Sequence, residues 1–568
     1  MKYVNGLKVK KSSVYTADFE TTSYPNLVKD GYVRVWLWSI VNCETFNCWF
    51  GYDIDSFIQK LKELKPKIVF FHNLKFDGNF LLYRLLELNE QTELTAPNGI
   101  WFSLKWNDIE FRDSLKKFQT TVLGLSVMLG MELKHSIRDN QDKNRWDYYI
   151  PKDYIPTKEE IEYCIHDSRI VAKGIANEWD LGRCRLTNSS EAFHNAKSQI
   201  KNFDKLFPQL SEENDTFVRA TYKGGFCSIN DKFQNIELNN IYAYDVNGLY
   251  GYVMDEGVIP VGEPYDTEPV SNKDICFIDF YCEFYLKTGY APILQIKNNP
   301  QYIGRETEYL TESDGITHLH LTDIDYELFK KHYHVYNEFG HEFKSFRSEK
   351  GILSPIIQHN IKMKAYYSTK ENYDDYKRTV YKNNTNMLYG SFGLSTINDI
   401  VTPYINEDGV LSMIHTKETK PARYIPVASY ITSQARRITI TAVQNNYKNW
   451  IYSDTDSMYL TKPAKNIPID DTKSGCWKFE GVDGMPYAKG KFLRQKTYIL
   501  ADENYNIYSH TDKYGKFHSK CVCAGLPDDI KKTIKWDDFK IGSSLGFRKA
   551  HTLVKGGVCL MDREFRIL

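Results

Sequence analysis

The sequence lacks the marks of a secreted or membrane-inserted chain. No apolar run follows Met1 as a signal peptide would require, and no window approaches the roughly 18 uninterrupted apolar residues of a membrane helix. Its 11 cysteines are scattered, odd in number and form no Cys-x-x-Cys pair, which argues against a disulfide framework and against zinc-ribbon patterns. We therefore expect a reduced, soluble protein of the cytoplasm.

The chain also lacks net charge. Its 73 acidic and 73 basic side chains cancel, so no overall field predicts a polyanionic partner, and any basic track must be local. Tyrosine, by contrast, is abundant, with 41 residues in a chain of 568. Such a count suits stacking platforms for nucleic-acid bases, although a tyrosine-rich core explains it equally well. The length is too great for one compact core and predicts several domains.

A pair of acids, Asp454 and Asp456, lies in the stretch Tyr452-Ser-Asp-Thr-Asp-Ser457, after a strand-like run. In extended backbone the two would point to the same side, and such neighbours raise each other's pKa unless a cation lies between them. Taken alone, the stretch is more simply a solvated turn. A hard-cation site of Mg²⁺ or Mn²⁺ type is the alternative, and Asp245, at the end of another predicted strand, is its candidate third carboxylate.

A second set of acids is spread over the N-terminal part of the chain. Asp18 and Glu20 share one face of a predicted strand, and Asp77 follows a buried strand at 68–71. Asp167 lies on a predicted helix, one turn after Tyr163 and therefore on the same face. Such a set could hold two metal ions about 3.5–4 Å apart that activate water against a phosphodiester, with the tyrosine positioning that water.

A basic segment at 352–389 has helical spacing. Arg378 and Lys382 are four residues apart, and Asn386 and Tyr389 continue the same face. A triphosphate needs a row of cations, and a nascent base pair needs an aromatic wall. A basic surface helix is the simpler alternative.

The N-terminal motifs resemble those of DEDD-type 3′–5′ proofreading exonucleases of the tyrosine-bearing subclass. In the form His72-Asn-Leu-Lys-Phe-Asp-Gly78, the second motif is similar to that of the protein-primed family B DNA polymerases of small tailed bacteriophages. The resemblance implies that the four acids are metal ligands and catalytic, and that Lys143 assists them. It also implies contacts with single-stranded DNA by His72, Asn73, Phe76, Ser114 and Leu115.

The later motifs resemble the polymerase motifs of the same family. The resemblance implies that Asp245, Asp454 and Asp456, with the backbone of Val246, hold Mg²⁺ (Mn²⁺ is possible), two ions per active site. Gly248 and Gly251 replace the usual Ser and Pro. The implied nucleotide contacts are Tyr250 (a gate against the ribose hydroxyl), Arg378, Lys382, Asn386 and Tyr389, and the implied DNA contacts are Tyr222, Gly224, Gly225, Thr432, Arg436, Arg494, Lys496 and Tyr498.

The fold class implied is α/β and α+β multidomain: an RNase H-like exonuclease domain and a right-hand polymerase domain with two insertions. The expected boundaries are 1–185 for the exonuclease, 186–256 for the first part of the palm, 257–350 for a terminal-protein docking insertion, 351–393 for the fingers, 394–422 for a hairpin-like insertion serving processivity and strand displacement, 423–525 for the second part of the palm, and 526–568 for the thumb.

The expected function is replicative, protein-primed DNA synthesis with proofreading, in the cytoplasm of an infected bacterium. The expected partners are DNA, dNTPs and a terminal protein whose hydroxyl is the first primer, with no membrane. Two other interpretations remain open: a stand-alone exonuclease with an inactive polymerase body, and a non-catalytic DNA-binding scaffold.

The insertion at 257–350 holds a group of histidines at 318, 320, 332, 334 and 341. A strand-spaced His-x-His pair could bind zinc. No acid or cysteine partner is evident for them, so zinc binding is the less favoured interpretation.

Overall fold

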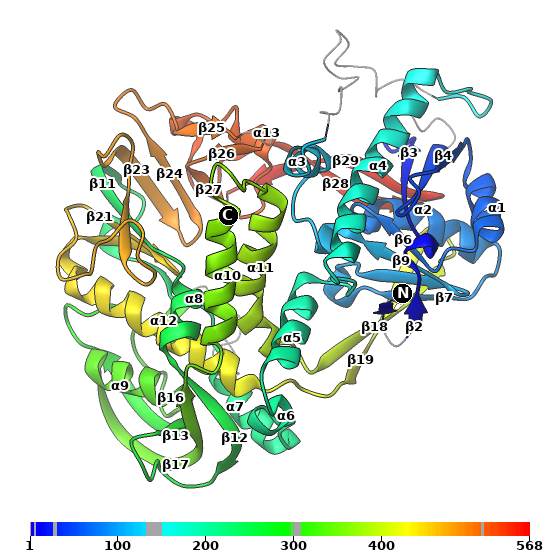
Figure 1. The fold of residues 1–568 in the computed structure, drawn as a ribbon. Coiled ribbons are helices and arrows are strands. Elements are labelled where there is room, and N and C mark those ends of the chain that lie inside the picture. Colours follow the sequence, from blue (N-terminus) through cyan, green and yellow to red (C-terminus); the bar gives the residue numbers. More distant parts are fainter. Residues whose placement is uncertain are drawn as a thin grey trace.

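A mixed β-sheet organises the N-terminal part of the chain (Figure 1). The computed structural model describes residues 2–4, 7–25, 31–131, 150–296, 299, 301, 308–512 and 516–567. The sheet has the strand order β19-β18-β7-β8-β9-β6-β3-β4-β5, in which β3, β6 and β9 are parallel. Its bounds are β3 Val14–Thr21, β4 Val35–Asn42, β5 Cys48–Gly51, β6 Ile68–Phe71, β7 Thr92–Thr95, β8 Ser103–Trp106, β9 Ile109–Asp113, β18 Ile397–Ile405 and β19 Leu411–Thr419. A separate small hairpin joins β1 Lys2–Val4 to β2 Leu7–Val9.

Helices pack against this sheet and fix its acids in place. They are α1 Ile54–Leu64, α2 Leu74–Glu87, α3 Val122–Met128 and α4 Lys158–Asp180. A capping box between Thr157 and Glu160 starts α4. The hydroxyl of Thr16 on β3 donates to the carbonyl of Ser168 on α4 at 2.8 Å, in a buried contact. This bond holds the helix against the strand that carries Asp18 and Glu20.

A second sheet forms the centre of the C-terminal part. Its order is β10-β20-β21-β11-β23-β24-β27, and β22 pairs with β11. The strands are β10 Cys227–Ile229, β11 Glu237–Val246, β20 Trp450–Asp454, β21 Ser457–Leu460, β22 Trp477–Glu480, β23 Tyr487–Arg494, β24 Thr497–Ala501 and β27 Cys521–Cys523. Helices α8 Leu249–Glu256 and α12 Ile425–Asn445 belong to the same core. Helix α12 begins at Ile425, with Pro426 in its first turn.

The basic segment predicted as one helix is two. Helix α10 spans Ser354–Tyr366 and α11 spans Asp375–Phe392, and the two pack side by side (Figure 1). The polar stretch between them ends at Asp374, whose carboxylate accepts from the amide of Lys377 and caps α11. Of the three helices that follow α4, α5 Asn188–Gln199 packs against α11, α6 Phe203–Leu206 packs against α5, and α7 Glu212–Thr221 packs against α12.

The segment 257–350 folds as an antiparallel sheet below the second core (Figure 1). Its order is β12-β17-β13-β16, so β16 is an edge strand. The elements are β12 Val258–Tyr265, β13 Asp274–Leu286, β16 Thr317–Thr322, α9 Asp323–His332 and β17 Tyr333–Lys350. The strand predicted at 290–294 is reduced to the short pair β14 Leu294–Gln295 and β15 Tyr309–Leu310.

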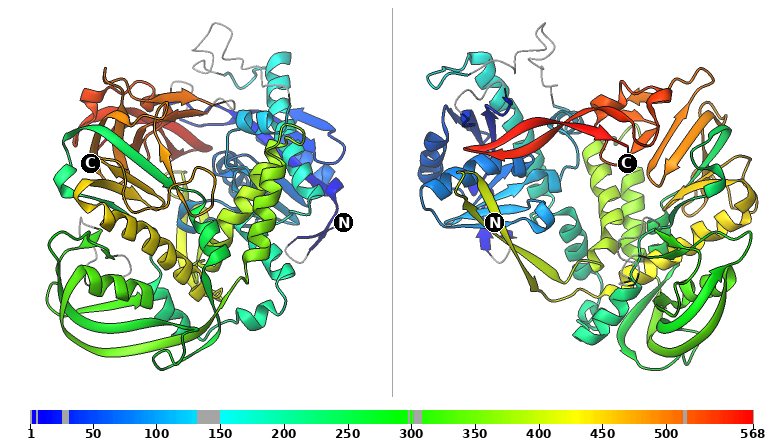
Figure 2. Two further views of the ribbon diagram at one scale, coloured as in Figure 1. Left: turned by 60° about the vertical axis from the view of Figure 1, so that its left-hand side comes forward. Right: turned by 180° about the vertical axis from the view of Figure 1, so that it is seen from behind.

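Two long hairpins reach back to the N-terminal part, as the rear view in Figure 2 shows. One is β18–β19, which the sequence predicted as a hairpin-like segment, and it extends the N-terminal sheet where Val401 pairs with Leu94. The other is β28 Ser544–Val554 with β29 Gly557–Arg566. Their tips meet over α2: Tyr83 donates to the Gly409 carbonyl at 3.0 Å, and a Cβ at Gly409 would lie 3.1 Å from Lys555.

The base of the second hairpin carries small elements, namely β25 Ser509–Thr511, β26 Phe517–Ser519 and α13 Asp528–Lys531. All 11 cysteines are free thiols. Among the helices that the structure describes, none is long and apolar enough to cross a membrane.

Candidate functional site

The acids of the second sheet meet where three strands end. Asp245 is the penultimate residue of β11, and Asp454 ends β20. Asp245 and Asp454 both pair with Ser457 across the sheet. Between Asp454 and Asp456 the chain makes a tight turn, in which Thr455 has φ +61°, a conformation rare for a β-branched residue. The sequence predicted a strand running into a polar turn at this stretch, and the structure confirms it: Asp454 ends the strand and Asp456 lies in the turn.

Two carboxylates of this centre, those of Asp245 and Asp456, are harder to ionise than isolated ones. Burial, with the nearby charges of Asp456 and Glu480 adding to its effect, raises the pKa of Asp245 to about 7. Burial likewise raises the pKa of Asp456, with Asp454 and Glu480 adding to the effect. Carboxylates that resist ionisation together are stabilised by a divalent cation, so the donor set fits Mg²⁺ or Mn²⁺. Glu480 was not found from the sequence, since nothing there placed β22 beside β11.

The backbone of Val246 completes this arrangement. Its amide donates to the carbonyl of Asp456 at 2.8 Å, which ties β11 to the turn. Only its carbonyl oxygen could therefore serve an ion. Gly248, where the related motif has Ser, lies at φ +59° as the N-cap of α8, a conformation that glycine adopts without strain.

Lys496 supplies the nearest cation to Asp454. Its ammonium lies 2.9 Å from one carboxylate oxygen and 3.0 Å from the other. Burial alone would lower the pKa of Lys496, but the ion pair raises it overall. The residue lies in the turn between β23 and β24 with φ +54°, so the segment around it is a hairpin.

The neighbours of Lys496 differ in their access to solvent. Arg494 is exposed at the end of β23, and its Nε donates to the hydroxyl of Thr497 at 3.3 Å. Tyr498 is buried, with its hydroxyl 2.9 Å from that of Tyr459. Tyr498 therefore supports the hairpin from the core side, whereas Arg494 and Lys496 are exposed to solvent.

The loop of Tyr222, Gly224 and Gly225 packs directly against the acidic turn. The amide of Thr455 donates to the carbonyl of Phe226 at 2.7 Å. A Cβ at Gly225 would lie 2.6 Å from the hydroxyl oxygen of Thr455, closer than atoms can approach. Glycine is needed there because any side chain would displace the turn.

Arg436 has a role that the sequence did not indicate. Its guanidinium, only 3% exposed, donates to the carbonyls of Lys223 (2.9 Å) and Gly224 (2.8 Å) and pairs with Asp325 of α9. It cannot meet a DNA phosphate from this position, so the expected phosphate contact is corrected to a residue that positions the loop. Thr432 is likewise buried, and its hydroxyl donates within α12 to the carbonyls of Ala428 and Ser429.

Cations and aromatic rings gather on α10, α11 and α8. Burial, then the charges of Lys382 and Arg378, lower the pKa of Lys364, which shows that three cations share one field. Lys364 belongs to the basic segment recognised in the sequence, but its closeness to Arg378 and Lys382 arises only from the packing of α10 against α11. Asn386 is exposed on the same helix as Lys382.

The two tyrosines predicted to meet the nucleotide stack on each other. The rings of Tyr250 and Tyr389 lie 4.1 Å apart between centroids, with 17° between their planes. Burial raises the pKa of both, and the charge of Asp456 raises it further, so the stacked pair lies within electrostatic reach of the acids. An aromatic wall thus borders the acidic centre, as the sequence predicted.

The N-terminal acids form a second centre. Oxygen atoms of Asp18 and Glu20 and the sulfur of Cys164 lie within 4.8 Å of one another. Burial raises the pKa of Cys164 well above its usual range, and the charges of Asp18 and Glu20 add to the rise. The thiol is therefore a poor metal ligand, and it borders the two carboxylates as an uncharged group. Asp77 is 4% exposed; burial raises its pKa strongly, and Asp18 adds to the rise. Such a set also fits a divalent cation.

Helix α4 contributes the remaining acid. Asp167 is 8% exposed on α4, and Tyr163 lies partly buried one turn before it. The charge of Asp167 acts on His72 and on Cys164, which places it at the same centre. Lys143 lies outside the described residues.

The loops beside this centre are fixed by hydrogen bonds. His72 lies 2.9 Å from the hydroxyl of Ser114 and 2.8 Å from the carbonyl of Thr120, and burial lowers its pKa. The ring is therefore neutral, and its Nε2–H donates to the carbonyl. The carboxylate of Asp113 accepts from the amides of Asn73 (3.0 Å) and Leu115 (2.9 Å). His72 and Ser114 thus orient the loops around Asp77.

Phe76 points to the second long hairpin. Its ring lies 5.6 Å from that of His551 on β28, with the planes 64° apart. The predicted single-strand contact is therefore also a contact between α2 and the C-terminal hairpin.

Comparison with known proteins agrees with this architecture. The family described as DNA polymerase type B, organellar and viral, matches residues 131–474. The DNA polymerase of Bacillus phage phi29 is 31% identical over 99% of this chain and its own whole length, and that of Streptococcus phage Cp-1 is 31% identical over 88% of this chain and 87% of its own.

Solved structures agree as well. The phi29 DNA polymerase complexed with primer-template DNA and incoming nucleotide substrates covers 98% of this chain with a TM-score of 0.85, at 31% identity over its whole length. The fold is thus shared over nearly the full chain. The chain belongs to the family of organellar and viral type B DNA polymerases.

Proposed function

We propose that the centre at Asp245, Asp454 and Asp456 is a DNA-directed DNA polymerase site, and that the N-terminal centre is a 3′–5′ proofreading exonuclease. The observation that carries the first assignment is that three features lie together. They are carboxylates with raised pKa, a stacked tyrosine pair within electrostatic reach of Asp456, and a row of cations on α10 and α11. An acidic site needs metal to bind an anion, and a nucleoside triphosphate brings both phosphates and an aromatic base.

The chain's own residues divide the work of nucleotidyl transfer. Lys364, Arg378 and Lys382 attract the triphosphate, and Tyr250 and Tyr389 confine its sugar and base. Lys496 and Arg494 hold the primer strand. Asp245, Asp454, Asp456 and the carbonyl of Val246 would hold two Mg²⁺ or Mn²⁺ ions. When bound, such ions lower the pKa of the attacking hydroxyl and neutralise the leaving pyrophosphate.

The N-terminal centre would hold its own pair of ions through Asp18, Glu20, Asp77 and Asp167. Tyr163 orients the attacking water, and Asn73, Phe76 and Leu115 meet the single-stranded 3′ end, with His72 and Ser114 behind them. A mismatched end frays more readily than a matched one, so hydrolysis supplies a second round of discrimination.

We assign the segments 1–185, 257–350, 351–393 and 526–568 to the exonuclease, the terminal-protein docking insertion, the fingers and the thumb, with the palm at 186–256 and 423–525. The first primer is then a hydroxyl of a terminal protein, bound at the sheet of 257–350. The site of action is the cytoplasm of the infected bacterial cell.

The insertion at 394–422 is assigned to processivity and strand displacement. The support is the contact between the tips of the two long hairpins at Gly409 and Lys555. Through this contact the hairpins β18–β19 and β28–β29 together form a closed path of chain between the two centres. DNA enclosed by such a path is retained between cycles of addition.

Primer extension on a DNA template with Mg²⁺ and dNTPs tests the assignment. A polymerase lengthens the primer, whereas a stand-alone exonuclease shortens it and a scaffold leaves it unchanged. Protein priming is tested separately, by incubating the chain with candidate terminal proteins and one labelled dNTP. Covalent label on a protein supports priming, and label on DNA primers alone rejects it while leaving the polymerase assignment intact.

A further inference from the structure

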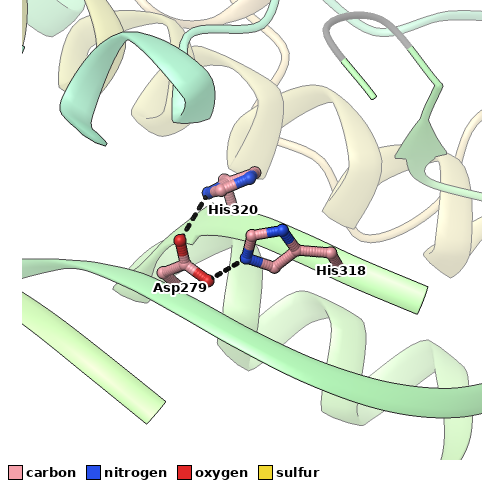
Figure 3. Close-up of side chains that lie close together, drawn as sticks. All are labelled: Asp279, His318 and His320. Carbon is pink, nitrogen blue, oxygen red and sulfur yellow. Dashed lines mark hydrogen bonds and ion pairs between the residues drawn. The ribbon is translucent and has the colours of Figure 1, made fainter. Parts of the chain in front are cut away.

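Three side chains that can bind a metal ion meet in the insertion at 257–350, outside both carboxylate centres. Asp279 on β13 pairs directly with His320 on β16, and Tyr281 pairs with His318. Side chains two residues apart on a strand share a face, so Asp279, His318 and His320 lie together, as Figure 3 shows. The intervening residues Ile278, Phe280, Leu319 and Leu321 are buried in the core.

The acid partner of these histidines was not visible in the sequence. His318 and Asp279 are 39 positions apart, and only the antiparallel register of β13 and β16 brings them together. Zinc binding was the less favoured interpretation because no acid partner was evident in the sequence, and Asp279 shows that this premise is wrong.

The donor atoms converge on one point. Nε2 of His318 contacts one oxygen of Asp279, and Nδ1 of His320 lies 3.1 Å from the other oxygen. All three residues offer a donor atom within 4.8 Å of the others. Bonds of about 2.0–2.1 Å from zinc to nitrogen or oxygen separate tetrahedral ligands by roughly 3.3 Å, so the spacing at His320 already suits a shared ion.

Nδ1 of His320 has a further property that hydrogen bonding within the cluster does not account for. The atom is shielded from solvent and makes no hydrogen bond of acceptable geometry, despite its closeness to Asp279. Buried ring nitrogens are normally satisfied. A lone pair directed at a cation held by the same carboxylate would satisfy it.

We propose that Asp279, His318 and His320 bind one divalent first-row transition metal ion, with Zn²⁺ the best fit. Two imidazoles and one carboxylate favour such ions over Mg²⁺, which prefers oxygen ligands throughout. The site is open on one side, because the His318 side chain is 38% exposed while those of His320 and Asp279 are 18% and 15% exposed. A fourth position is thereby left to water or to a donor of a bound partner.

The ion clamps an edge strand that leads to the polymerase centre. Strand β16 continues into α9, where Asp325 pairs with Arg436, the residue that holds the loop of Lys223 and Gly224. His320 lines the same cavity of about 30 Å³ as Lys223, Asp325 and Arg436. Fastening β16 to β13 therefore steadies the support of that loop.

The surroundings fix the ring of His318 for this role. It stacks on Tyr281, with 4.3 Å between ring centroids and 7° between planes, and Tyr281 stacks in turn on Phe339 at 5.5 Å. A ligand ring whose rotation is restricted by packing loses little freedom on metal binding.

The test uses the full chain, stripped with chelator and returned to buffer with excess Mg²⁺, so that Mg²⁺ competes at the oxygen-rich centres. Zinc is then added, and bound metal is counted by mass spectrometry after gel filtration. We expect the wild type to retain one equivalent more than His318→Asn/His320→Asn. His334→Asn is the matched control, since His334 is exposed on the same sheet and stacks on Tyr285 without a carboxylate; it should bind as the wild type does.

Two further readouts keep the proposal decidable. Zinc should raise the midpoint of thermal unfolding by about 2 °C or more in the wild type and in His334→Asn, but not in the double variant. Co²⁺ should give the visible absorption of a tetrahedral nitrogen–oxygen site in the wild type. If the double variant does not fold, as judged by circular dichroism, Asp279→Asn replaces it. Equal zinc retention by wild type and a folded variant, or no Co²⁺ absorption in the wild type, would overturn the proposal.

Discussion

The two carboxylate centres of this chain are built in opposite ways. The N-terminal centre draws its acids from a sheet strand and two helices, and Asp77 and Asp167 are almost fully buried. The C-terminal centre places two acids in a tight turn, and Asp454 faces the cation of Lys496, whose side chain is 56% exposed. The acids of the first centre are held by regular secondary structure, whereas Asp454 of the second is held by an ion pair with Lys496 that a ligand can replace.

The difference suits the two reactions. Hydrolysis of a frayed end needs one geometry that excludes correctly paired DNA, and regular secondary structure holds functional groups most accurately. Synthesis must release and rebind its substrate at every step. A turn supported by a neighbouring loop and balanced by a lysine can accept a metal, a triphosphate and a primer in succession.

The largest expected effect separates the centres outright. Asp454→Ala should reduce primer extension by about a thousandfold, roughly 4 kcal/mol of lost transition-state stabilisation, because a metal ligand is removed. Degradation of a single-stranded 3′ end should persist. Gel assays of both reactions check this, with exposed Asp471→Ala as the control. Loss of both activities in a folded protein would mean that the centres are not independent.

The converse change should act on the other centre alone. Asp18→Ala with Glu20→Ala should lower 3′ degradation by a similar factor and leave extension intact, since these acids lie on β3 of the N-terminal sheet and the turn at 454–456 belongs to the second sheet. Exposed Glu44→Ala is the control. Persistent degradation with Mg²⁺ would reject the N-terminal assignment.

A third change tests the aromatic wall beside the C-terminal centre. Tyr250→Val removes a ring that stacks on Tyr389 and should admit ribonucleotides, with selectivity for deoxyribose falling by about a hundredfold, or ~2.7 kcal/mol. Steady-state incorporation of matched dNTP and rNTP pairs measures the ratio. Tyr252→Val, on the same helix, is the control. Unchanged sugar selectivity would remove the gate role from Tyr250.

A fourth change tests whether the acidic turn depends on its neighbouring loop. Gly225→Ala puts a Cβ against Thr455 and should lower extension by about 10–100-fold with degradation of single strands unchanged. Adding Thr455→Gly, which removes the clashing atoms, should restore much of the rate. Absence of any rescue in this double-mutant cycle would place the effect of Gly225 elsewhere.

The smallest expected effect concerns charge. Lys364→Ala should raise the KM for dNTPs by about tenfold, as loss of one phosphate contact predicts, with kcat little altered and exposed Lys370→Ala as the control.

The pH dependence follows from the lowered pKa of Lys364. The wild type should lose nucleotide affinity as pH rises through a value below the ordinary 10.5, because the lysine is then neutral. Lys364→Arg should abolish that dependence, since arginine stays charged. An identical pH profile in Lys364→Arg and wild type would assign the titration to another group.

Local patterns were enough to predict much of the fold. Strand β6 begins and ends at the predicted residues, 68–71, and Asp167 lies on a helix, α4, as its spacing from Tyr163 indicated. Short-range hydrophobic periodicity determines such elements. The split of α10 from α11 was missed because polar residues at 367–374 can continue an exposed helix as easily as end one.

Contacts between distant segments could not be predicted. From the sequence Arg436 is a candidate phosphate contact, but in the structure it forms an ion pair with Asp325, more than a hundred positions earlier. Glu480 and Lys364 join their sites only through sheet and helix packing. Asp279 meets the histidines through strand register alone. In each case the missing information was which segments become neighbours, and single-sequence reasoning does not contain it.

The ion pair of Lys496 with Asp454 has a thermodynamic consequence. One ammonium cannot serve as the counter-ion of Asp454 and grip a primer at the same time. Metal capture by Asp454 frees the lysine for DNA, and DNA that takes the lysine frees Asp454 for metal. If Asp454 holds a metal ion and Lys496 the primer, as proposed, each ligand must therefore raise the affinity for the other by the same factor, which makes this side chain the coupling element between cofactor and primer.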